Sequence, residues 1–430
     1  MKIAVVGLWH LGTVTAAALA AEGHEVVAID EPAVVDGIGT GRLPVDEPGL
    51  ADLIAAERAA GRLTFGTSAA DAAGAELVWI CYDTPVDDDD RPDVASVVDR
   101  AAAFLDAFAG EAVVAVSSQL PVGTVAELER RANGARFHFA SIPENLRLGS
   151  AIAYFRAPDR FVVGVRDARA REVVERAVGA FAPSIVWMSV ESAEVTKHAI
   201  NAFLATSVAF ANELASVCER VGADAREVER GLKSDVRIGP KAYVRAGEAF
   251  AGGTLARDLA FLAMLGDRER LELEQLRATA ASNERHRRWT AERVAEVTRG
   301  MASPRVAILG LVYKPGTDTL RASTAVALAR VLHERGADVV AYDPAVPADD
   351  ARLVPFVRTV TTAAGALHDA DVAVVATAWP VFRDIPEVGF TAMRGRVVVD
   401  PARFLEDRLS GVPGLRYLGF GRAPALEGVE

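Results

Sequence analysis

The first residues whose types and spacing could do chemistry are two glycines, Gly7 and Gly12, between a short β-branched run and an Ala-rich stretch. A glycine turn between a strand and a helix presents backbone N–H groups to a pyrophosphate at the helix N-terminus. The next apolar run ends at Asp30, and a carboxylate in that place can hold ribose hydroxyls. The pattern predicts a dinucleotide site, and an acidic rather than a basic residue there favours NAD over NADP.

Trp9 occupies the middle position of this turn, where a third glycine would let the phosphates come close. The signal is therefore only moderately specific. The alternative is a Rossmann-like domain that has lost its dinucleotide.

The elements that must position this turn alternate between strands and helices. Strands are expected at residues 3–6, 25–29, 77–81, 112–116 and 161–165, with helical stretches between them, of which the first is 14–21. This alternation predicts a mostly parallel sheet with helices on both faces.

The pattern changes near residue 190 and returns near residue 305. Helical stretches at 193–220 and 257–299 flank a Gly-rich loop at 247–253, and then Arg305-Val-Ala-Ile-Leu-Gly310 echoes Lys2-Ile-Ala-Val-Val-Gly7. Later strands are expected at 337–342, 371–377 and 396–399. The fold class is α/β, with two Rossmann-like domains (1–190 and 299–430) joined by a central helical domain (191–298). The central domain joins two complete cores and is expected to carry a homodimer contact.

Length and composition support this division. A chain of 430 residues is too long for one core, and a formal net charge of −12 argues against a broad nucleic-acid or membrane footprint. Cys81 and Cys218 cannot build a disulfide framework or a cysteine metal cluster, which fits a reducing cytoplasm. No signal peptide and no apolar run of about 20 residues are present. We predict a cytoplasmic protein without a metal site.

Several longer motifs follow one another along nearly the whole chain. They are Pro44-Val-Asp-Glu-Pro-Gly-Leu50, Cys81-Tyr-Asp-Thr-Pro85, Ser117-Ser-Gln-Leu-Pro-Val-Gly-Thr124, Pro143-Glu-Asn-Leu-Arg-Leu-Gly149, Lys197-His-Ala-Ile-Asn201, Gly310-Leu-Val-Tyr-Lys-Pro-Gly-Thr-Asp318 with Arg321, Tyr342-Asp-Pro344 and Thr377-Ala-Trp379. In kind and in order they resemble those of the UDP-glucose/GDP-mannose dehydrogenase family. The resemblance implies NAD-dependent oxidation of a sugar-nucleotide C6 alcohol, through an aldehyde, to a uronic acid.

The resemblance also implies the catalytic groups of the first oxidation. Lys197, Asn201 and Asp258 match positions that bind water or a developing oxyanion, and Glu144 matches a retained acid. Lys197 and Asn201 are four residues apart, so both lie on one side of a helix. The alternative is a surface salt bridge and a solvated asparagine.

The second oxidation departs from the family. The family's loop Gly-x-Gly-x-Gly-Gly-x-Cys supplies a thiolate that captures the aldehyde, whereas here it is Gly247-Glu-Ala-Phe-Ala-Gly-Gly-Thr254. Thr254 is a poor nucleophile because the pKa of a hydroxyl is far above that of a thiol. Leu148 stands where the family has a glutamate for thioester hydrolysis. Four outcomes stay open: release of an aldehyde, acid formation through a bound water, isomerisation by return of the hydride, and a non-catalytic nucleotide-sugar binder or regulator.

The remaining candidate residues are also carried by the resemblance. Any single arginine is more often a solvated surface charge, but Lys314 and Arg321 share one motif. Arg237 matches an arginine that reaches into a dimer partner's site, and Tyr243 matches an aromatic residue near the phosphates. The cofactor-binding candidates are Gly7, Leu11, Gly12, Asp30, Thr84 and Gln119, and the substrate-binding candidates are Arg147, Arg237, Tyr243, Gly252, Gly253, Arg257, Lys314 and Arg321.

Overall fold

The computed structural model describes residues 1–85, 92–132, 136–143, 146, 149–251, 254–321, 323–353 and 355–423. The chain forms two compact units, unit 1 (Met1–Ile200 with Asp267–Glu269) and unit 2 (Asn201–Gly266 with Arg270–Glu430). The division falls within one long helix, α8 (Val190–Val221). The three domains expected from the sequence therefore stay a prediction.

Unit 1 is built on an eight-stranded sheet in the order β3-β2-β1-β4-β5-β6-β7-β8. Neighbouring strands are parallel except β6 and β7, which confirms the predicted mostly parallel sheet. The strands are β1 (Lys2–Val6), β2 (Glu25–Ile29), β3 (Leu63–Gly66), β4 (Leu77–Ile80), β5 (Ala112–Val116), β6 (Phe137–Ser141), β7 (Phe161–Val165) and β8 (Ile185–Met188).

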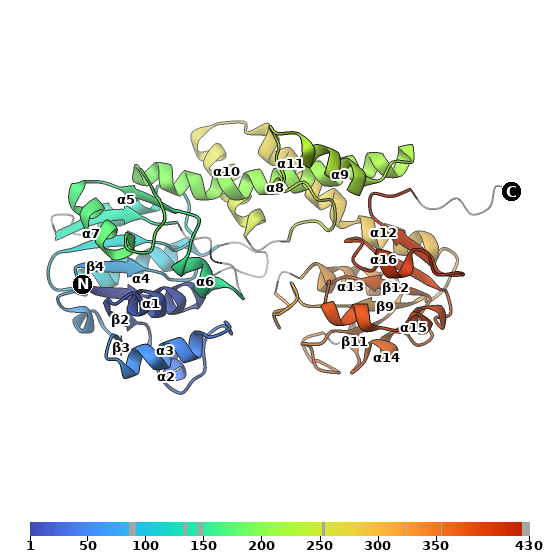
Figure 1. Cartoon of the computed structure of the whole chain (residues 1–430), viewed down its shortest axis with the longest axis horizontal. Coiled ribbons are helices and arrows are strands. Elements are labelled where there is room, and N and C mark those ends of the chain that lie inside the picture. The colour runs from blue at the N-terminus through green and yellow to red at the C-terminus, as the bar shows by residue number, and fades with distance from the viewer. Residues whose placement is uncertain are drawn as a thin grey trace. The chain divides into compact units, whose positions relative to one another are not determined.

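Helices cover both faces of this sheet (Figure 1). Ile3 and Val5 of β1 pack in one apolar cluster, and Ala4 and Val6 pack in another, because successive strand side chains point to opposite faces. The first cluster includes α1 (His10–Ala21), α3 (Leu50–Ala59), α6 (Ala151–Arg156) and α7 (Ala168–Val178). The second includes η1 (Ala69–Ala72), α4 (Val94–Ala107) and α5 (Thr124–Arg131). Helix α2 (Pro32–Gly39) follows β2.

Unit 2 repeats this arrangement in a six-stranded parallel sheet of order β11-β10-β9-β12-β13-β14. The repeat expected from the two similar strand–glycine sequences is confirmed. The strands are β9 (Arg305–Leu309), β10 (Asp338–Tyr342), β11 (Arg358–Thr359), β12 (Val372–Val375), β13 (Val397–Asp400) and β14 (Arg416–Gly419). Helices α12 (Trp289–Val297) and α13 (Thr324–Glu334) pack in one apolar cluster, and α14 (Ala363–Leu367), η3 (Pro380–Asp384), α15 (Glu387–Thr391) and α16 (Glu406–Leu409) follow along the chain.

The segment between the sheets is helical, as predicted. Its helices are α8, α9 (Ala225–Ser234), α10 (Leu255–Glu269) and α11 (Glu274–Arg287), followed by α12. The expected single stretch 257–299 is wrong, because the chain turns between α10 and α11, where Arg270 and Leu273 adopt positive φ angles of 59° and 42°.

Helix α8 is, among the described helices, the one long and apolar enough by length and composition to cross a membrane. We expected no apolar run of that length, so the finding differs from the sequence prediction. Polar side chains on α8 have partners inside unit 2: buried Asn212 bonds to the backbone of Gly247 and Glu248, and partly buried Thr206 bonds to Thr279. We therefore interpret α8 as a packed helix of the folded protein.

Candidate functional site

The predicted dinucleotide turn lies where β1 ends and α1 begins. Gly7 has a φ of +95°, and a Cβ there would lie 2.6 Å from the backbone nitrogen of Tyr82, so a side chain cannot be accommodated. A Cβ on Gly12 would lie 1.7 Å from the Gly7 carbonyl oxygen, so helix and strand pack too closely for any other residue. Thr13 N–H donates the first helical bond, to Trp9 O at 3.0 Å. The amides of the preceding residues therefore form the anion-binding end of α1.

Asp30 is tied to this turn. Its Oδ2 atom accepts a hydrogen bond from Leu8 N–H at 2.6 Å, and its Oδ1 atom accepts one from Glu31 N–H at 2.8 Å. Arg100 of α4 lies 3.1 Å from Oδ1, and its guanidinium stacks 4.2 Å above the ring of Tyr82. Burial raises the pKa of Tyr82 to about 12, so its hydroxyl is neutral at physiological pH. Arg100 was not expected from the sequence, because it lies 70 residues from its partner.

The turn suits a dinucleotide in most respects. The two outer glycines are required by the backbone, and the acidic residue stands beside the turn. Trp9, in contrast, is 48% exposed directly before α1, where a third glycine would leave room for the phosphates. The residues present fit the adenosine end and the helix N-terminus, with a bulky side chain beside the pyrophosphate position.

Two further cofactor candidates are brought together. The hydroxyl of Thr84, which is 1% exposed, donates a hydrogen bond of 2.7 Å to the carbonyl oxygen of Gln119. Thr84 follows β4 and Gln119 follows β5, so both lie at the carboxyl edge of the sheet that Gly7 and Asp30 share. Leu11, in the first turn of α1, is partly buried.

Glu47, which lies in the Pro44–Leu50 motif, is a buried carboxylate next to the glycine turn that the sequence did not lead us to expect there. Its buried carboxylate accepts hydrogen bonds from Gly149 N–H at 2.8 Å and Ala151 N–H at 2.7 Å, at the start of α6. Its Oε2 atom is also 3.0 Å from Nε2 of His10, the first residue of α1. Glu47 therefore connects the dinucleotide turn to the segment that follows the Pro143–Gly149 motif.

Helix α8 carries two of the catalytic candidates, Lys197 and Asn201, and contacts within unit 1 fix its first turns. Glu194 accepts hydrogen bonds from the backbone amides of Gly123 (2.8 Å) and Val125 (3.0 Å), at the start of α5. Burial raises the pKa of Glu194. One turn later, Nε2 of His198 lies 3.0 Å from the carbonyl oxygen of Leu120. These contacts orient the helix turn on which half-buried Lys197 lies.

Asn201 and Asp258 are brought together as a pair. The Asn201 amide donates a hydrogen bond to Oδ2 of Asp258, and Asp258, in the first turn of α10, has no exposed surface. A buried carboxylate is stable only when it is paired or hydrogen-bonded. The two side chains are therefore in contact, and their action in one catalytic site stays a prediction.

Thr254 is exposed and lies directly before α10, where its carbonyl oxygen accepts the helical bond from Asp258 N–H at 3.1 Å. Among the described residues, no hydrogen bond joins its hydroxyl to a basic side chain. The preceding loop is held from two sides: Asn212 of α8 bonds to Gly247, and Asn283 of α11 accepts from Phe250 N–H and donates to Phe250 O, both at 2.9 Å.

Tyr243 and Tyr313, from two segments of unit 2, lie close enough for the charge of one to act on the other. Burial, and then the neighbouring Tyr243, raise the pKa of Tyr313. Tyr313 directly precedes Lys314, which is partly buried, and Arg321 is exposed. Arg257 is half-buried in α10.

Arg237 forms a local ion pair in the single chain. Its guanidinium is 2.7 Å from Oδ2 of Asp235, and its side chain is 85% exposed. Its expected reach into a partner's site stays a prediction. Glu144, Arg147, Leu148, Gly252 and Gly253 lie outside the described residues.

The two cysteines are both buried, and Cys81 lies against the glycine turn, where a Cβ on Gly12 would be 3.1 Å from its own Cβ. Cys81 follows β4 and has no exposed surface, and Cys218 lies in α8 and is 5% exposed. Burial raises the pKa of Cys218, which keeps it a thiol. Within the described part of the chain, no cluster of three or more His, Cys, Asp or Glu residues could hold a metal.

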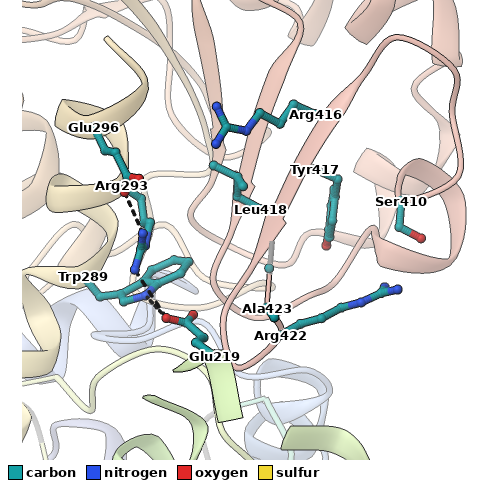
Figure 2. A pocket seen from close by; sticks show the side chains of 11 residues that line it. Glu219, Trp289, Arg293, Glu296, Ser410, Arg416, Tyr417, Leu418, Arg422 and Ala423 are labelled. Carbon is teal, nitrogen blue, oxygen red and sulfur yellow. Dashed lines mark hydrogen bonds and ion pairs between the residues drawn. The ribbon is translucent and has the colours of Figure 1, made fainter. Parts of the chain in front are cut away.

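A cavity of about 150 Å³ opens elsewhere in unit 2, beside the edge strand β14 (Figure 2). Arg293 of α12 spans its wall, 2.6 Å from Glu296 and 3.4 Å from Glu219. None of the residues predicted to bind cofactor or substrate lines it.

Comparison with known proteins identifies the family. The NAD binding domain of the UDP-glucose/GDP-mannose dehydrogenase family matches residues 1–181, its central domain residues 191–285 and its UDP binding domain residues 307–407. UDP-glucose 6-dehydrogenase TuaD of Bacillus subtilis is 32% identical, over 100% of this chain and 95% of that protein. UDP-glucose 6-dehydrogenase AglM of Haloferax volcanii is 34% identical, over 95% of this chain and 98% of that protein.

A solved structure agrees with these matches. A UDP-glucose dehydrogenase from Pyrobaculum islandicum superimposes with a TM-score of 0.85 at 33% identity, covering 94% of this chain and 95% of that one. With its glycine turn, its paired asparagine and aspartate and its two Rossmann-like sheets, the chain belongs to the UDP-glucose/GDP-mannose dehydrogenase family.

Proposed function

We propose that this NAD-dependent nucleotide-sugar dehydrogenase oxidises a CH–OH group of its substrate once and releases the aldehyde. The observation that carries the proposal is Thr254, an exposed hydroxyl at the position where the family's motif has a cysteine. A cysteine thiol ionises near pH 8.5 and lower beside a cation. A threonine hydroxyl needs an adjacent base to become a nucleophile.

The first oxidation uses groups that the chain retains. Bound NAD would accept the hydride from the carbon, and the hydroxyl proton must leave to a base or a water. Asn201 and buried Asp258 form a fixed polar pair. Lys197 lies one turn before Asn201 on α8, so its ammonium can stabilise the developing oxyanion. Gly7, Gly12 and Asp30 would hold the dinucleotide, with Thr84 and Gln119 at the same sheet edge.

The substrate we propose is a UDP-linked sugar, with UDP-glucose as the first to test. The C-terminal part of the chain matches a UDP binding domain, and the relatives described above are named UDP-glucose dehydrogenases. Tyr243, Lys314 and Arg321 are the described residues that we assign to the diphosphate. A diphosphate is an anion that is bound by converging cations and N–H donors. Because the chain as a whole is acidic, these groups must be gathered locally at the binding site.

A second candidate function is a non-catalytic nucleotide-sugar binder. Trp9 favours it, because a half-exposed indole beside the pyrophosphate position weakens dinucleotide binding. The retained Asn201–Asp258 pair favours the enzyme, because a binder has no need for a buried carboxylate fixed at the start of α10.

We further propose a cytoplasmic homodimer that uses α8. Phe203, Phe210 and Val217 follow one another at intervals of seven residues and are 71%, 48% and 55% exposed. Residues seven apart lie on nearly the same side of a helix. Exposed apolar stripes of this kind mark protein–protein contacts.

The deciding experiment is the stoichiometry of NADH released per UDP-glucose consumed, with a hydrazine present to trap an aldehyde. One NADH and a trapped hydrazone are expected. Two NADH and a uronic acid would contradict the proposal and point to a bound water as the nucleophile. Saturable binding of UDP-glucose without any NADH would favour the non-catalytic binder.

A further inference from the structure

An arginine in unit 1 is held by two carboxylates and one aromatic ring beside the dinucleotide turn. Nη2 of Arg100 in α4 donates to Oδ1 of Asp30 at 3.1 Å and lies 3.1 Å from Oε1 of Glu31. The Arg100 guanidinium stacks on Tyr82, with 4.2 Å between Cζ and the ring centroid. We call these four residues, Asp30, Glu31, Tyr82 and Arg100, the Arg100 cluster.

The Arg100 cluster is attached to the turn itself. A Cβ added to Gly7 would lie 2.7 Å from Cδ1 of Tyr82, so the tyrosine ring packs directly against the turn. Asp30 is bound to the same turn through Leu8 N–H at 2.6 Å, and its side chain is only 9% exposed. The Arg100 side chain is 40% exposed. The guanidinium is therefore supported by the turn and is still accessible to a bound molecule.

The place of the Arg100 cluster in the sheet indicates which part of a cofactor it meets. In a dinucleotide-binding sheet, a carboxylate at the end of the second strand binds the ribose hydroxyls, whereas a nearby arginine accommodates the 2′-phosphate of NADP. Arg100 is hydrogen-bonded to that carboxylate, which belongs to Asp30. A guanidinium can bind a phosphate through two parallel N–H bonds. A group that suits a 2′-phosphate thus lies directly beside a group that repels it.

We propose that Arg100 and Tyr82 form a latent 2′-phosphate subsite, which the carboxylates of Asp30 and Glu31 occupy in place of a phosphate. The preference for NAD is then set by the Arg100 cluster and not by Asp30 alone. The two carboxylates repel a phosphate, and they also neutralise the cation that would bind it. This inference depends on the match of residues 1–181 to an NAD binding domain, and not on whether oxidation stops at the aldehyde.

Neutralising the two carboxylates should uncover the subsite. In Asp30→Asn the amide oxygen can still accept from Leu8 N–H, so the turn keeps its contact with the end of β2. Glu31→Gln changes a side chain that is 70% exposed. Arg100 should stay in place in both variants, because the Tyr82 ring supports its guanidinium.

Two nucleotides that differ by one phosphate test the subsite by binding alone. They are 5′-AMP and 2′,5′-ADP, which carries a second phosphate on the 2′ oxygen, and calorimetry measures the Kd of each. In the wild type we expect 5′-AMP to bind at least as tightly as 2′,5′-ADP. In Asp30→Asn combined with Glu31→Gln, 2′,5′-ADP should bind roughly tenfold more tightly than 5′-AMP, because a charge-assisted pair replaces the repulsion.

A second change to the double variant shows whether Arg100 is responsible. Adding Arg100→Gln should abolish the preference for 2′,5′-ADP. A preference that persists without Arg100 would overturn the proposal. So would its absence from a double variant that keeps the wild-type melting temperature. If the double variant is destabilised, Glu31→Gln alone should move the ratio of the two Kd values roughly threefold towards 2′,5′-ADP, and an unchanged ratio would equally overturn the proposal.

The control is an arginine of unit 1 with the same exposure and the same number of acidic partners. Arg131 in α5 is 40% exposed and lies 2.5 Å from Asp99 and 2.7 Å from Glu127. Asp99→Asn combined with Glu127→Gln removes as much negative charge as the test variant and should leave the ratio of the two Kd values unchanged. An equal gain for 2′,5′-ADP in this control would mean that net charge, and not a built subsite, is responsible.

The whole cofactors complete the test. The ratio of the Kd for NADP to the Kd for NAD should fall roughly tenfold in the variant with Asp30→Asn and Glu31→Gln, and it should return to the wild-type value when Arg100→Gln is added. A gain for 2′,5′-ADP without any change in this ratio would contradict a role of the Arg100 cluster in the choice of cofactor.

Discussion

Asn201 and Asp258 are hydrogen-bonded across 57 residues of chain, and the carboxylate of the pair has no exposed surface. The bond joins α8 to the first turn of α10, directly after Thr254. A group so placed is held in one orientation by both helices, which is what stabilisation of a developing charge requires.

Asn201→Ala should lower kcat with UDP-glucose by about a hundredfold, because it removes a donor that is held in a fixed position beside buried Asp258. Initial rates of NADH formation measure the effect. Thr206→Ala, one turn and a half further along α8, is the matched control and should retain the rate. A similar loss in both variants would indicate damage to the helix and not to the site.

Asp30→Ala should weaken NAD binding, since the carboxylate at the end of β2 positions the turn through Leu8 N–H and would bind the ribose hydroxyls of NAD. In the wild type, NAD should raise the melting temperature more than NADP does. In Asp30→Ala, the difference between the shifts in melting temperature caused by NAD and by NADP should be smaller. Equal shifts with the two cofactors in the wild type would count against Asp30 as the discriminating residue.

Thr254→Cys should capture the aldehyde as a thiohemiacetal, detectable as a mass increase on that residue's peptide and as sensitivity to thiol-directed inactivators. Acid release should stay slow, because position 148 holds leucine. Thr254→Ser is the control, since it keeps a hydroxyl. Inactivation of the unmodified chain by the same reagents would instead implicate Cys81 or Cys218.

Replacement of the exposed apolar stripe on α8 should dissociate the dimer. Phe203→Ser combined with Phe210→Ser removes two aromatic side chains that are 71% and 48% exposed, so the monomer should lose little stability. Light scattering at micromolar concentration measures the mass. Val236→Ser, at a position 94% exposed outside the helix, should leave it unchanged. A monomeric wild type would remove both the dimer and the role of Arg237 in a partner's site.

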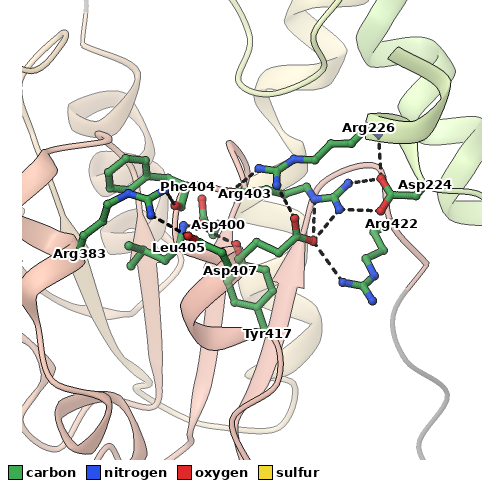
Figure 3. A network of polar contacts seen from close by, with 11 residues as sticks. Asp224, Arg226, Arg383, Asp400, Arg403, Phe404, Leu405, Asp407, Tyr417 and Arg422 are labelled. Carbon is green, nitrogen blue, oxygen red and sulfur yellow. Dashed lines mark hydrogen bonds and ion pairs between the residues drawn. The ribbon is translucent and has the colours of Figure 1, made fainter. Parts of the chain in front are cut away.

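Asp224→Asn should lower the unfolding free energy at neutral pH by about 1 kcal/mol, because the bond from Arg403 (Figure 3) holds the pKa of Asp224 at about 2, against an ordinary 3.8, and solvent screens this partly exposed pair. A depressed pKa contributes its stability above pH 3.8 and loses it as the pH falls towards 2. In urea unfolding, the difference in unfolding free energy between Asp224→Asn and the wild type should therefore become smaller as the pH is lowered. A difference in unfolding free energy that does not change with pH would mean that the variant is destabilised by lost packing and not by lost charge.

The sequence predicts the parts of the site that are local in the chain. The turn from β1 to α1, the end of β2 and the spacing of Lys197 and Asn201 depend on neighbouring residues, and strands β2, β5 and β7 have the expected bounds. Glu47, Glu194 and Arg100 were not assigned roles, because their partners lie 104, 71 and 70 residues away and no spacing signals such a contact. The break between α10 and α11 was missed for a different reason: Arg270 and Leu273 take positive φ angles without glycine or proline to mark them.

The two edge strands of the sheet in unit 2 also bear on the tendency of the protein to aggregate. An open sheet ends in two strands whose outward N–H and C=O groups could pair with a neighbouring molecule. One end is β11, which has only two residues and offers little length to pair with. The other is β14, where the exposed Arg416 begins the strand and Arg422 follows it. One short edge strand and one edge strand flanked by arginines both disfavour edge-to-edge pairing between molecules. Replacing Arg416 with valine would remove a charge from the edge strand β14 and should increase aggregation.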